Sequence, residues 1–417
     1  MEDKYKKLIM VTSANNNKFY EMKNNDNGTF TVEYGRVGAK AQTSTYPISQ
    51  WNKKYNEKIK KGYKDQTELF VTEIVDEAKN ESSKTVDNKR DPKVISMVNK
   101  LQGWANKSIS VNYEVSSEQV TQKQIDKAQS VIDDLVAFNL TESNINSFNN
   151  ILLDFFSIVP RKMKNVKSNL IDTKLSGNKL QETKNNIISN EQDTLDVMAG
   201  QVQLNTNTKS STETDQKSNE INDIVKSSGL EFEVVNDSSI IDMVKGMMQN
   251  NAHKLKSVYK VVNLHTQKNF DDHVKNAKDK TTKLYWHGSK NENWWSIITT
   301  GLKIRPSNAV HTGSMFGDGI YYASKFQKSF GYSSGRNSYW ARGNSNEATL
   351  AIYDVHVGKQ KLIKKHDSSC YSLNYNKIQK EGFDSVFAQG GIDLINDEFI
   401  VYNSNQCTIK YLILVEA

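Results

Sequence analysis

Residues 284–289 read LYWHGS, residues 312–323 read TGSMFGDGIYYA, and residues 396–402 read NDEFIVY. In this part of the chain, short β-prone runs alternate with tight turns, and twelve of the 21 glycines fall between residues 281 and 417. Such alternation predicts a strand-rich domain in which a ligand pocket can form. The expected strands are Lys283–His287, Gly319–Ala323, Leu350–Val357, Glu398–Asn403 and Lys410–Glu416.

The sequence upstream of this domain has a different character in each of its parts. At 417 residues the chain is long enough for two to three domains. The first 75 residues predict strands at 7–12, 18–23 and 29–37, then a polar helix over 48–61. Residues 92–200 carry apolar side chains at helical spacing and predict a helical bundle. Residues 201–228 are polar, lack aromatic side chains and favour a flexible insertion.

Charge is distributed unevenly along the chain. The net charge is +7, and residues 1–64 contain 13 Lys/Arg against 6 Asp/Glu, so this excess lies in the N-terminal part. A basic module on a neutral body is typical of a protein that binds an anion such as nucleic acid, although a solvated lysine-rich surface has the same composition. The basic residues on the predicted helix are Lys53, Lys54, Lys58, Lys60 and Lys61.

Several classes of protein are excluded. Two cysteines, Cys370 and Cys407, do not form a CxxC pair, and the seven histidines show no metal-ligand spacing, so no metal site is expected. No apolar run is long enough to span a membrane and no signal peptide is recognisable, which predicts an intracellular protein without membrane contact. The GDG triplet at 317–319 does not complete a GxGxxG motif, which argues against a dehydrogenase.

Four features of the C-terminal region can carry chemistry. His287 ends a predicted strand beside Gly288, and Glu398 lies in an apolar strand where glutamate is depleted. Residues 328–332 read KSFGY, which places Ser329 and Tyr332 on one face of a helical turn. The rings of Tyr321 and Tyr332 can sandwich a flat heteroaromatic group. Two tyrosines of an ordinary core would give the same pattern.

Together, the order and spacing of these motifs resemble the His-Tyr-Glu signature of the poly(ADP-ribose) polymerase family, here at His287, Tyr321 and Glu398. Upstream, FFSIVP at 155–160 resembles a segment of that family's helical regulatory domain, and YGRVG at 34–38 resembles the WGR motif of its DNA-binding domain. This sequence departs from the pattern at Tyr34, where tryptophan is usual, and at Asp397, where asparagine is more familiar.

The resemblance implies a multidomain α+β protein. It would contain a small β-rich WGR domain, an all-α regulatory bundle and a mixed α/β ADP-ribosyltransferase domain with a split antiparallel β core. The expected boundaries are 1–88 for the WGR domain, 90–200 for the helical domain, 201–225 for a flexible polar linker and 226–417 for the catalytic domain. By the same resemblance the bundle would restrain the catalytic site until DNA binds.

The resemblance further implies that NAD⁺ is a consumed co-substrate and that no metal takes part. Glu398 would stabilise the charge that develops on the ribose as nicotinamide leaves, and His287 would bind a ribose hydroxyl at the adenosine end. Gly288 and Ser329 would hold the carboxamide between the rings of Tyr321 and Tyr332. Further contacts on the adenosine side would come from Ser289 and Asn293.

The partners implied are DNA with strand breaks, with 5′-phosphorylated nicks or ends preferred, and protein acceptors that include the chain itself. Tyr34 and Arg36 would lead the DNA contacts, and the lysine cluster would face phosphates. The protein would be DNA-associated, in the nucleus of a eukaryotic host or the cytoplasm and nucleoid of a bacterium. Two alternatives stay open: a mono-ADP-ribosyltransferase on the same scaffold, and a catalytically silent protein that binds DNA ends.

Overall fold

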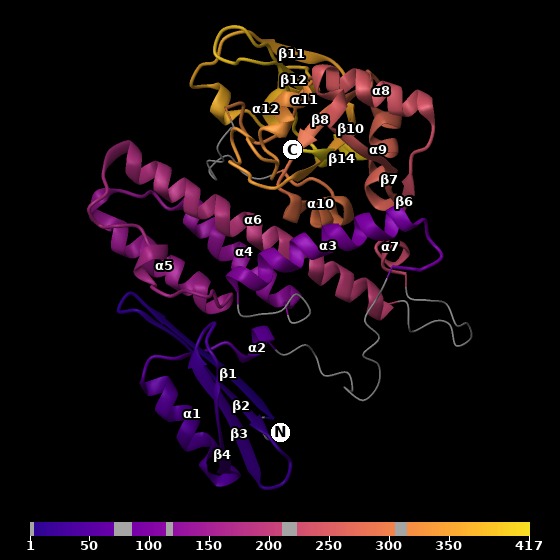
Figure 1. The fold of residues 1–417 in the computed structure, drawn as a ribbon. Helices are drawn as coiled ribbons and strands as arrows, with labels where there is room; N and C mark the ends of the chain where they lie inside the picture. Colours follow the sequence, from indigo (N-terminus) through magenta and orange to yellow (C-terminus); the bar gives the residue numbers. More distant parts are fainter. Residues whose placement is uncertain (1–3, 71–85, 114–119, 211–222, 305–314) are drawn as a thin grey trace. The chain divides into compact units, whose positions relative to one another are not determined.

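The computed structural model describes residues 4–70, 86–113, 120–210, 223–304 and 315–417 (Figure 1). The chain divides into two compact units. The first contains an N-terminal sheet and the helical segment from Asn106 to Val202. The second contains residues 86–105 and the C-terminal region, in which the two catalytic-domain sheets lie.

The first unit begins with a five-stranded antiparallel sheet of order β4-β3-β2-β1-β5. Strands β1 to β4 are consecutive neighbours, because tight turns are sufficient to connect antiparallel strands. Trp51 of the following helix packs on Phe30 with ring centroids 5.1 Å apart and closes a core with Leu8, Met22 and Val32. The elements are β1 (Tyr5–Thr12), β2 (Asn16–Asn24), β3 (Thr29–Arg36), β4 (Gln42–Pro47), α1 (Trp51–Lys60), β5 (Lys64–Asp65) and α2 (Thr67–Phe70).

Four helices follow, as the helical spacing of apolar residues predicts: α3 (Pro92–Asn112), α4 (Gln122–Ala137), α5 (Ile145–Ile158) and α6 (Gly177–Ser210). Helix α4 begins at a capping box, in which the Thr121 side chain accepts from the backbone of Gln124 and the Gln124 side chain accepts from Thr121. Its buried face carries Ile125, Ala128 and Ile132, at the spacing that identified the helix.

Helix α6 contains buried polar side chains and extends beyond its expected end. The stretch 174–192 is too polar to show an apolar period, yet Lys184, Glu191 and Gln192 are buried in it. The Glu191 carboxylate accepts a hydrogen bond from the Tyr113 hydroxyl and forms an ion pair with Arg161, so polar partners replace apolar packing. The flexible linker predicted over 201–225 is wrong for residues 201–210, which continue this helix. Residues 211–222 lie outside the described residues.

The second unit is built on two sheets (Figure 1). The larger has the order β6-β7-β14-β10-β8 and the smaller β11-β12-β13-β9, and an antiparallel bridge from Trp286 to Ala323 joins them. All pairings are antiparallel except β11 with β12, so the split antiparallel core is confirmed. The strands are β6 (Leu230–Val234), β7 (Leu255–Asn263), β8 (Thr282–Gly288), β9 (Ile320–Tyr322), β10 (Glu347–His356), β11 (Gln360–Ile363), β12 (Ser385–Ala388), β13 (Glu398–Val401) and β14 (Cys407–Glu416).

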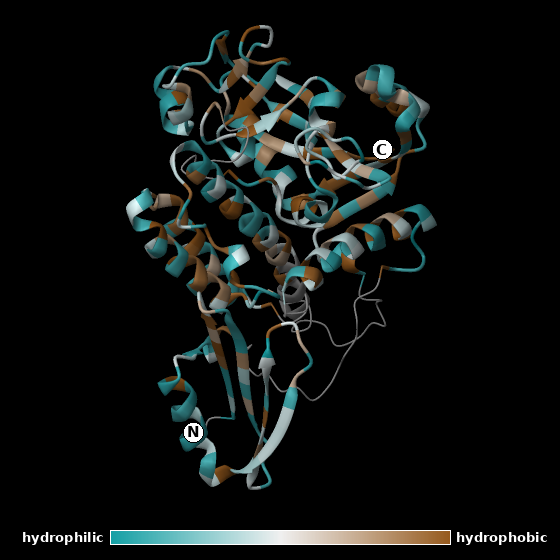
Figure 2. Ribbon diagram, turned by 60° about the vertical axis from the view of Figure 1, so that its left-hand side comes forward, coloured by the Kyte–Doolittle hydropathy of each residue, from teal (hydrophilic) through white to brown (hydrophobic). Residues whose placement is uncertain are grey.

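Apolar residues concentrate along these strands, and hydrophilic residues occupy most of the loops around them (Figure 2). A core cluster that includes Trp286, Phe330, Ile352 and Ile413 fixes the larger sheet against the helices that cover it. Helices α8 (Ser238–Met248), α9 (Leu264–Asn276), α10 (Trp294–Thr300) and α11 (Phe326–Phe330) contact that sheet, whereas Ile378 of α12 (Tyr375–Lys380) packs with residues of the smaller sheet.

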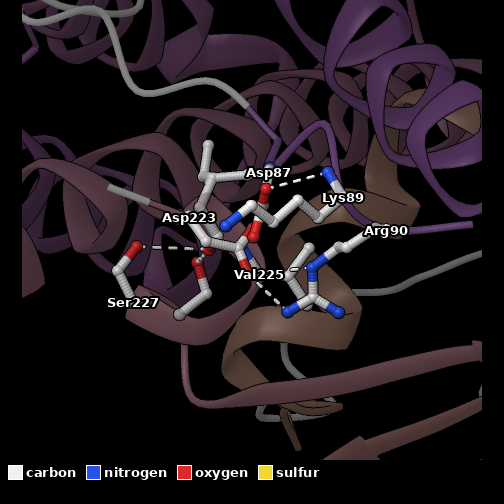
Figure 3. A network of polar contacts seen from close by, with 8 residues as sticks. Asp87, Lys89, Arg90, Asp223, Val225 and Ser227 are labelled. Atoms are coloured by element: carbon white, nitrogen blue, oxygen red, sulfur yellow. Dashed lines mark hydrogen bonds and ion pairs between the residues drawn. The ribbon is translucent and has the colours of Figure 1, made fainter. Parts of the chain in front are cut away.

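A polar clamp joins the segment before α3 to helix α7 (Ile224–Ser227) (Figure 3). Arg90 forms an ion pair with Asp223, whose side chain also caps α7 by accepting from the backbone of Val225. Burial opposes ionisation of Asp223, but the hydrogen bonds from Arg90 and the backbone outweigh it and lower its pKa. Since Ile224 and Val225 are buried, the expected domain boundary at residue 226 cuts through a packed helix.

Candidate functional site

His287 lies near the end of β8, and its imidazole ring is neutral and can accept a hydrogen bond. Its Nδ1 lies 3.0 Å from the carbonyl oxygen of Tyr321, which can only accept, so Nδ1 carries the proton. Burial lowers the pKa of His287 to about 4, although that hydrogen bond opposes the change. The imidazole is therefore uncharged at neutral pH, and its Nε2 lone pair can accept a hydrogen bond from a hydroxyl group.

Tyr321 of β9 closes the turn that precedes its own strand. Its hydroxyl donates to the carbonyl of Gly317 at 2.9 Å and accepts from the backbone N–H of Phe316 at 3.0 Å. Gly317 has a φ of +76°, and a Cβ there would lie 2.0 Å from the Leu373 carbonyl oxygen, so the turn requires glycine. Burial raises the pKa of Tyr321 well above its ordinary range, so this residue supplies a fixed ring and no proton.

Gly288 and Ser329 are in direct backbone contact. A Cβ built on Gly288 would lie 1.9 Å from the carbonyl oxygen of Ser329, so no other residue fits without moving α11. Ser329 is buried, and Tyr332, three residues later, is half-buried. Burial raises the pKa of Tyr332 to about 12, and the nearby charge of Glu398 adds to this rise. The structure thus brings Gly288 and Ser329 into contact and joins the backbone N–H of Tyr332 to the Ser329 carbonyl at 3.1 Å, and their role in binding nicotinamide stays a prediction.

Glu398 is the first residue of β13 and is only 6% exposed. Its Oε1 forms an ion pair with Lys328, whereas Oε2 is buried and has no hydrogen-bond partner among the described residues. Burial raises the pKa of Glu398, and the charge of Lys328 opposes part of that rise. A buried carboxylate oxygen without a donor is costly, so Oε2 is the expected position of a hydroxyl donor from a ligand.

Lys328 is a residue of this site to which the sequence assigned no role. It belongs to the KSFGY motif at 328–332, and its place beside Ser329 was the available signal. The partner could not be found in that way, because Glu398 lies 70 residues later, on β13, and only the folded chain brings it to Lys328 of α11.

Ser289 and Asn293 follow His287 by two and six positions in the chain and contact each other. The Asn293 amide donates to the Ser289 hydroxyl at 3.0 Å, and its Oδ1 is buried without a partner among the described residues. Both residues therefore offer polar atoms at one place, as expected of a pair that contacts the adenosine side of a ligand. The part of the chain that the structure describes contains no group of three or more side chains suited to a metal.

The candidate nucleic-acid surface of the first unit has two kinds of lysine. Lys58 lies 4.1 Å from the ring centroid of Tyr20 and 5.8 Å from that of Tyr34, and Lys54 lies 4.5 Å from that of Tyr46. Partial burial, and then Lys61 and Lys54, lower the pKa of Lys58. The remaining members of the cluster are exposed: Lys53, Lys60 and Lys61.

Arg36 is already engaged within the first unit. Its Nε donates to the carbonyl of Met163 at 3.2 Å, Nη1 donates to that of Asn15 at 3.0 Å, and Nη2 donates to that of Lys164 at 2.9 Å. The guanidinium therefore joins the N-terminal sheet to the segment after α5. A DNA contact by Arg36 stays a prediction, and it would have to compete with these carbonyl groups.

Comparison with known proteins agrees with this geometry. Residues 236–417 match the poly(ADP-ribose) polymerase catalytic domain, and residues 5–69 match the WGR domain. A putative poly [ADP-ribose] polymerase-like protein, 100L of Invertebrate iridescent virus 6, is 34% identical over 159 residues, which cover 37% of this chain and 83% of that protein. The uncharacterized protein 101L of the same virus is 34% identical over 201 residues, which cover 48% and 79%.

Longer relatives match over a smaller share of their length. Poly [ADP-ribose] polymerase 2 of Arabidopsis thaliana is 29% identical over 211 residues, which cover 44% of this chain and 32% of that protein. The Homo sapiens protein of the same name is 28% identical over 158 residues, which cover 32% and 26%. The chain belongs to the poly(ADP-ribose) polymerase family, and its C-terminal domain is an ADP-ribosyltransferase domain that uses NAD⁺ as substrate.

Proposed function

We propose that this chain transfers ADP-ribose from NAD⁺ to protein acceptors, itself included, and extends the product into poly(ADP-ribose) when it binds broken DNA. One observation carries the catalytic part of this proposal. Glu398 presents a buried carboxylate oxygen, Oε2, that has no hydrogen-bond donor among the described residues, while its Oε1 forms an ion pair with Lys328.

The chemistry follows from the charge that develops. The bond between nicotinamide and ribose breaks, its electron pair leaves with neutral nicotinamide, and the ribose carbon becomes oxocarbenium-like. Glu398 would accept a hydrogen bond from the adjacent ribose hydroxyl and stabilise that positive charge. The oxygen of an acceptor hydroxyl, oriented by Glu398, then forms the new bond to that ribose carbon and releases its proton to water. Neutral His287 would accept a hydrogen bond from a hydroxyl of the other ribose, and Gly288 and Ser329 would hold the carboxamide.

Activation by DNA is supported by the WGR match and by the basic first unit. The expected ligand is a 5′-phosphorylated nick or end, met by Tyr34 and the lysines of α1. The expected location is on DNA inside the cell, which is the nucleus in a eukaryotic host. In the described chain, no helix is both long and apolar enough to cross a membrane.

Incubation with labelled NAD⁺, with and without a nicked duplex, followed by sizing of the products, tests this function. We expect long products that require the duplex. Single ADP-ribose additions would identify a mono-ADP-ribosyltransferase and contradict chain extension. Absence of any labelled product, with intact binding of the duplex, would identify a silent DNA-end-binding protein.

A further inference from the structure

Residues 334–346 of the second unit form a loop that is pinned at its base. The backbone N–H of Ser345 donates to the Ser334 carbonyl at 2.9 Å, and the backbone N–H of Arg336 donates to the Ser345 carbonyl at 2.8 Å. A Cβ at Gly343 would lie 2.2 Å from the Ser334 carbonyl oxygen, so the beginning and the end of the loop are in direct backbone contact. The backbone N–H of Trp340 donates to Gly331 at 2.8 Å and fixes the tip beside α11.

This loop presents two large aromatic side chains to solvent, which we call the aromatic corner: Tyr339, 73% exposed, and Trp340, 54% exposed. Their ring centroids lie 4.6 Å apart with an interplanar angle of 87°. The Trp340 ring is also stacked on Tyr332 of the candidate NAD⁺ site, with centroids 6.0 Å apart and an angle of 20°. The corner is therefore continuous with the wall of that site.

The loop itself carries only positive charge, and the Ser334 hydroxyl at its base donates to the Glu292 carboxylate at 3.3 Å. Residues 331–346 contain Arg336 and Arg342 and neither aspartate nor glutamate. Arg336 donates to the side chain of Asn346 at 2.7 Å. Arg342 is exposed, and no side-chain hydrogen bond or ion pair joins it to the described residues. Its φ of +48° is uncommon for a residue other than glycine, so the turn keeps this residue, two positions after Trp340, under local backbone strain.

We propose that the aromatic corner and Arg342 bind the adenosine diphosphate part of an ADP-ribose unit in the product chain. This inference rests on the proposed function. A purine stacks on an exposed aromatic ring, and a pyrophosphate pairs with a guanidinium. Two arginines match the charge of a single pyrophosphate, whereas a nucleic-acid strand needs a track of cations along its backbone. The continuity with Tyr332 would keep the growing product near the site that extends it.

Binding of purified ADP-ribose oligomers of one to three units, labelled with a fluorophore, tests the inference on the full chain without NAD⁺. We compare the natural protein with the double variant Tyr339→Ala/Arg342→Asn, in which asparagine tolerates the positive φ. The matched control is Tyr375→Ala/Lys364→Asn, which removes an exposed tyrosine and an exposed cation elsewhere in the same unit. Trp340 is left intact because it contacts Tyr332.

We expect the double variant to bind the oligomers about tenfold more weakly, as the loss of one stacked base implies, and the control to bind as the natural protein does. Affinities of the natural protein and the double variant within twofold of each other would overturn the inference. So would equal competition by single-stranded DNA of the same charge, which would mark a general nucleic-acid surface.

A second readout separates this inference from the proposed function. With NAD⁺ and nicked DNA, the double variant should release nicotinamide at the natural initial rate but make shorter products. If the natural protein releases no nicotinamide, the proposed function fails while the oligomer measurement still decides the inference. Products of natural length from the double variant would contradict a role in chain extension.

Discussion

Glu398 is buried and forms an ion pair with Lys328, whose side chain is partly exposed. Burial favours the protonated carboxyl and raises its pKa, whereas Lys328 favours the carboxylate. Stabilisation of an oxocarbenium-like ribose requires the carboxylate. Because the folded-state pKa is raised, the ionised form is lost as the pH falls through a value above the usual glutamate range, and the rate should fall there.

Replacement of Lys328 by glutamine should move this acid limb of the kcat profile to higher pH. The variant removes the charge that holds down the pKa of Glu398, so more alkaline solution is needed to ionise it. Lys325→Gln, which removes an exposed lysine just before the same helix, is the control and should keep the natural profile. A Lys328→Gln profile that overlays the natural one would show that the pair does not control ionisation.

Gly288 tests the backbone contact that positions the candidate nicotinamide site. An alanine Cβ would overlap the Ser329 carbonyl, so Gly288→Ala should lower thermal stability by about 1–3 kcal/mol and weaken NAD⁺ binding. Gly103→Ala is the matched control, since that glycine lies within α3 with open space around it. It should stabilise the protein by about 0.5–1 kcal/mol. Equal melting temperatures and NAD⁺ affinities for the two variants would refute the close contact.

At the scale of elements, an ion pair joins the first part of α3 to the larger sheet of the second unit. Lys100 of α3 and Lys256 of β7 contact the two oxygens of Glu347 on β10, at 2.5 Å and 2.7 Å. Burial opposes ionisation of Glu347, but hydrogen bonds from both lysines prevail and lower its pKa. If the helical region restrains the enzyme, as the resemblance implies, this contact favours the restrained state.

Lys100→Gln should therefore raise nicotinamide release without DNA by about two- to fivefold, because a partly exposed ion pair contributes about 0.5–1 kcal/mol. The rate at saturating DNA should stay unchanged. Lys93→Gln, which alters an exposed lysine of the same helix, should leave both rates as they are. An unchanged DNA-free rate for Lys100→Gln would mean that this contact has no part in the restraint.

The elements that the sequence predicted are those with local signals. Strands β1 to β3 and helix α5 follow from alternation and helical spacing, and the split core was implied by the family resemblance. The burial of Lys184 and Glu191 within α6 was not predicted, because their partners lie far along the chain. The contacts of Arg36 with Met163 and of Lys328 with Glu398 were not predictable for the same reason, since only the folded chain brings these residues together.

At the scale of the whole molecule, the excess charge of the first unit should make DNA binding depend steeply on salt. The exposed lysines Lys53, Lys60 and Lys61 are free of the ring contacts that hold Lys54 and Lys58. A triple change of these three to glutamine should reduce the slope of log affinity against log salt by about 3 for a nicked duplex. Fluorescence anisotropy at several salt concentrations measures this slope.

The control for this charge effect is the triple change of Lys275, Lys278 and Lys280 to glutamine, which removes the same charge from exposed positions of the second unit. It should preserve the natural slope. Equal slopes for the two triple variants would show that net charge, and no particular surface, governs DNA binding.

The rate of nicotinamide release by the full chain and by its Glu398→Gln variant tests the central claim most directly. The amide keeps the shape of the side chain but removes the negative charge. We predict that nicked DNA accelerates release by the natural protein, and that the variant is slower by about 10²–10³-fold while it binds NAD⁺ with nearly natural affinity. Release by Glu398→Gln at the natural rate would contradict the assignment of this carboxylate as the centre of the reaction.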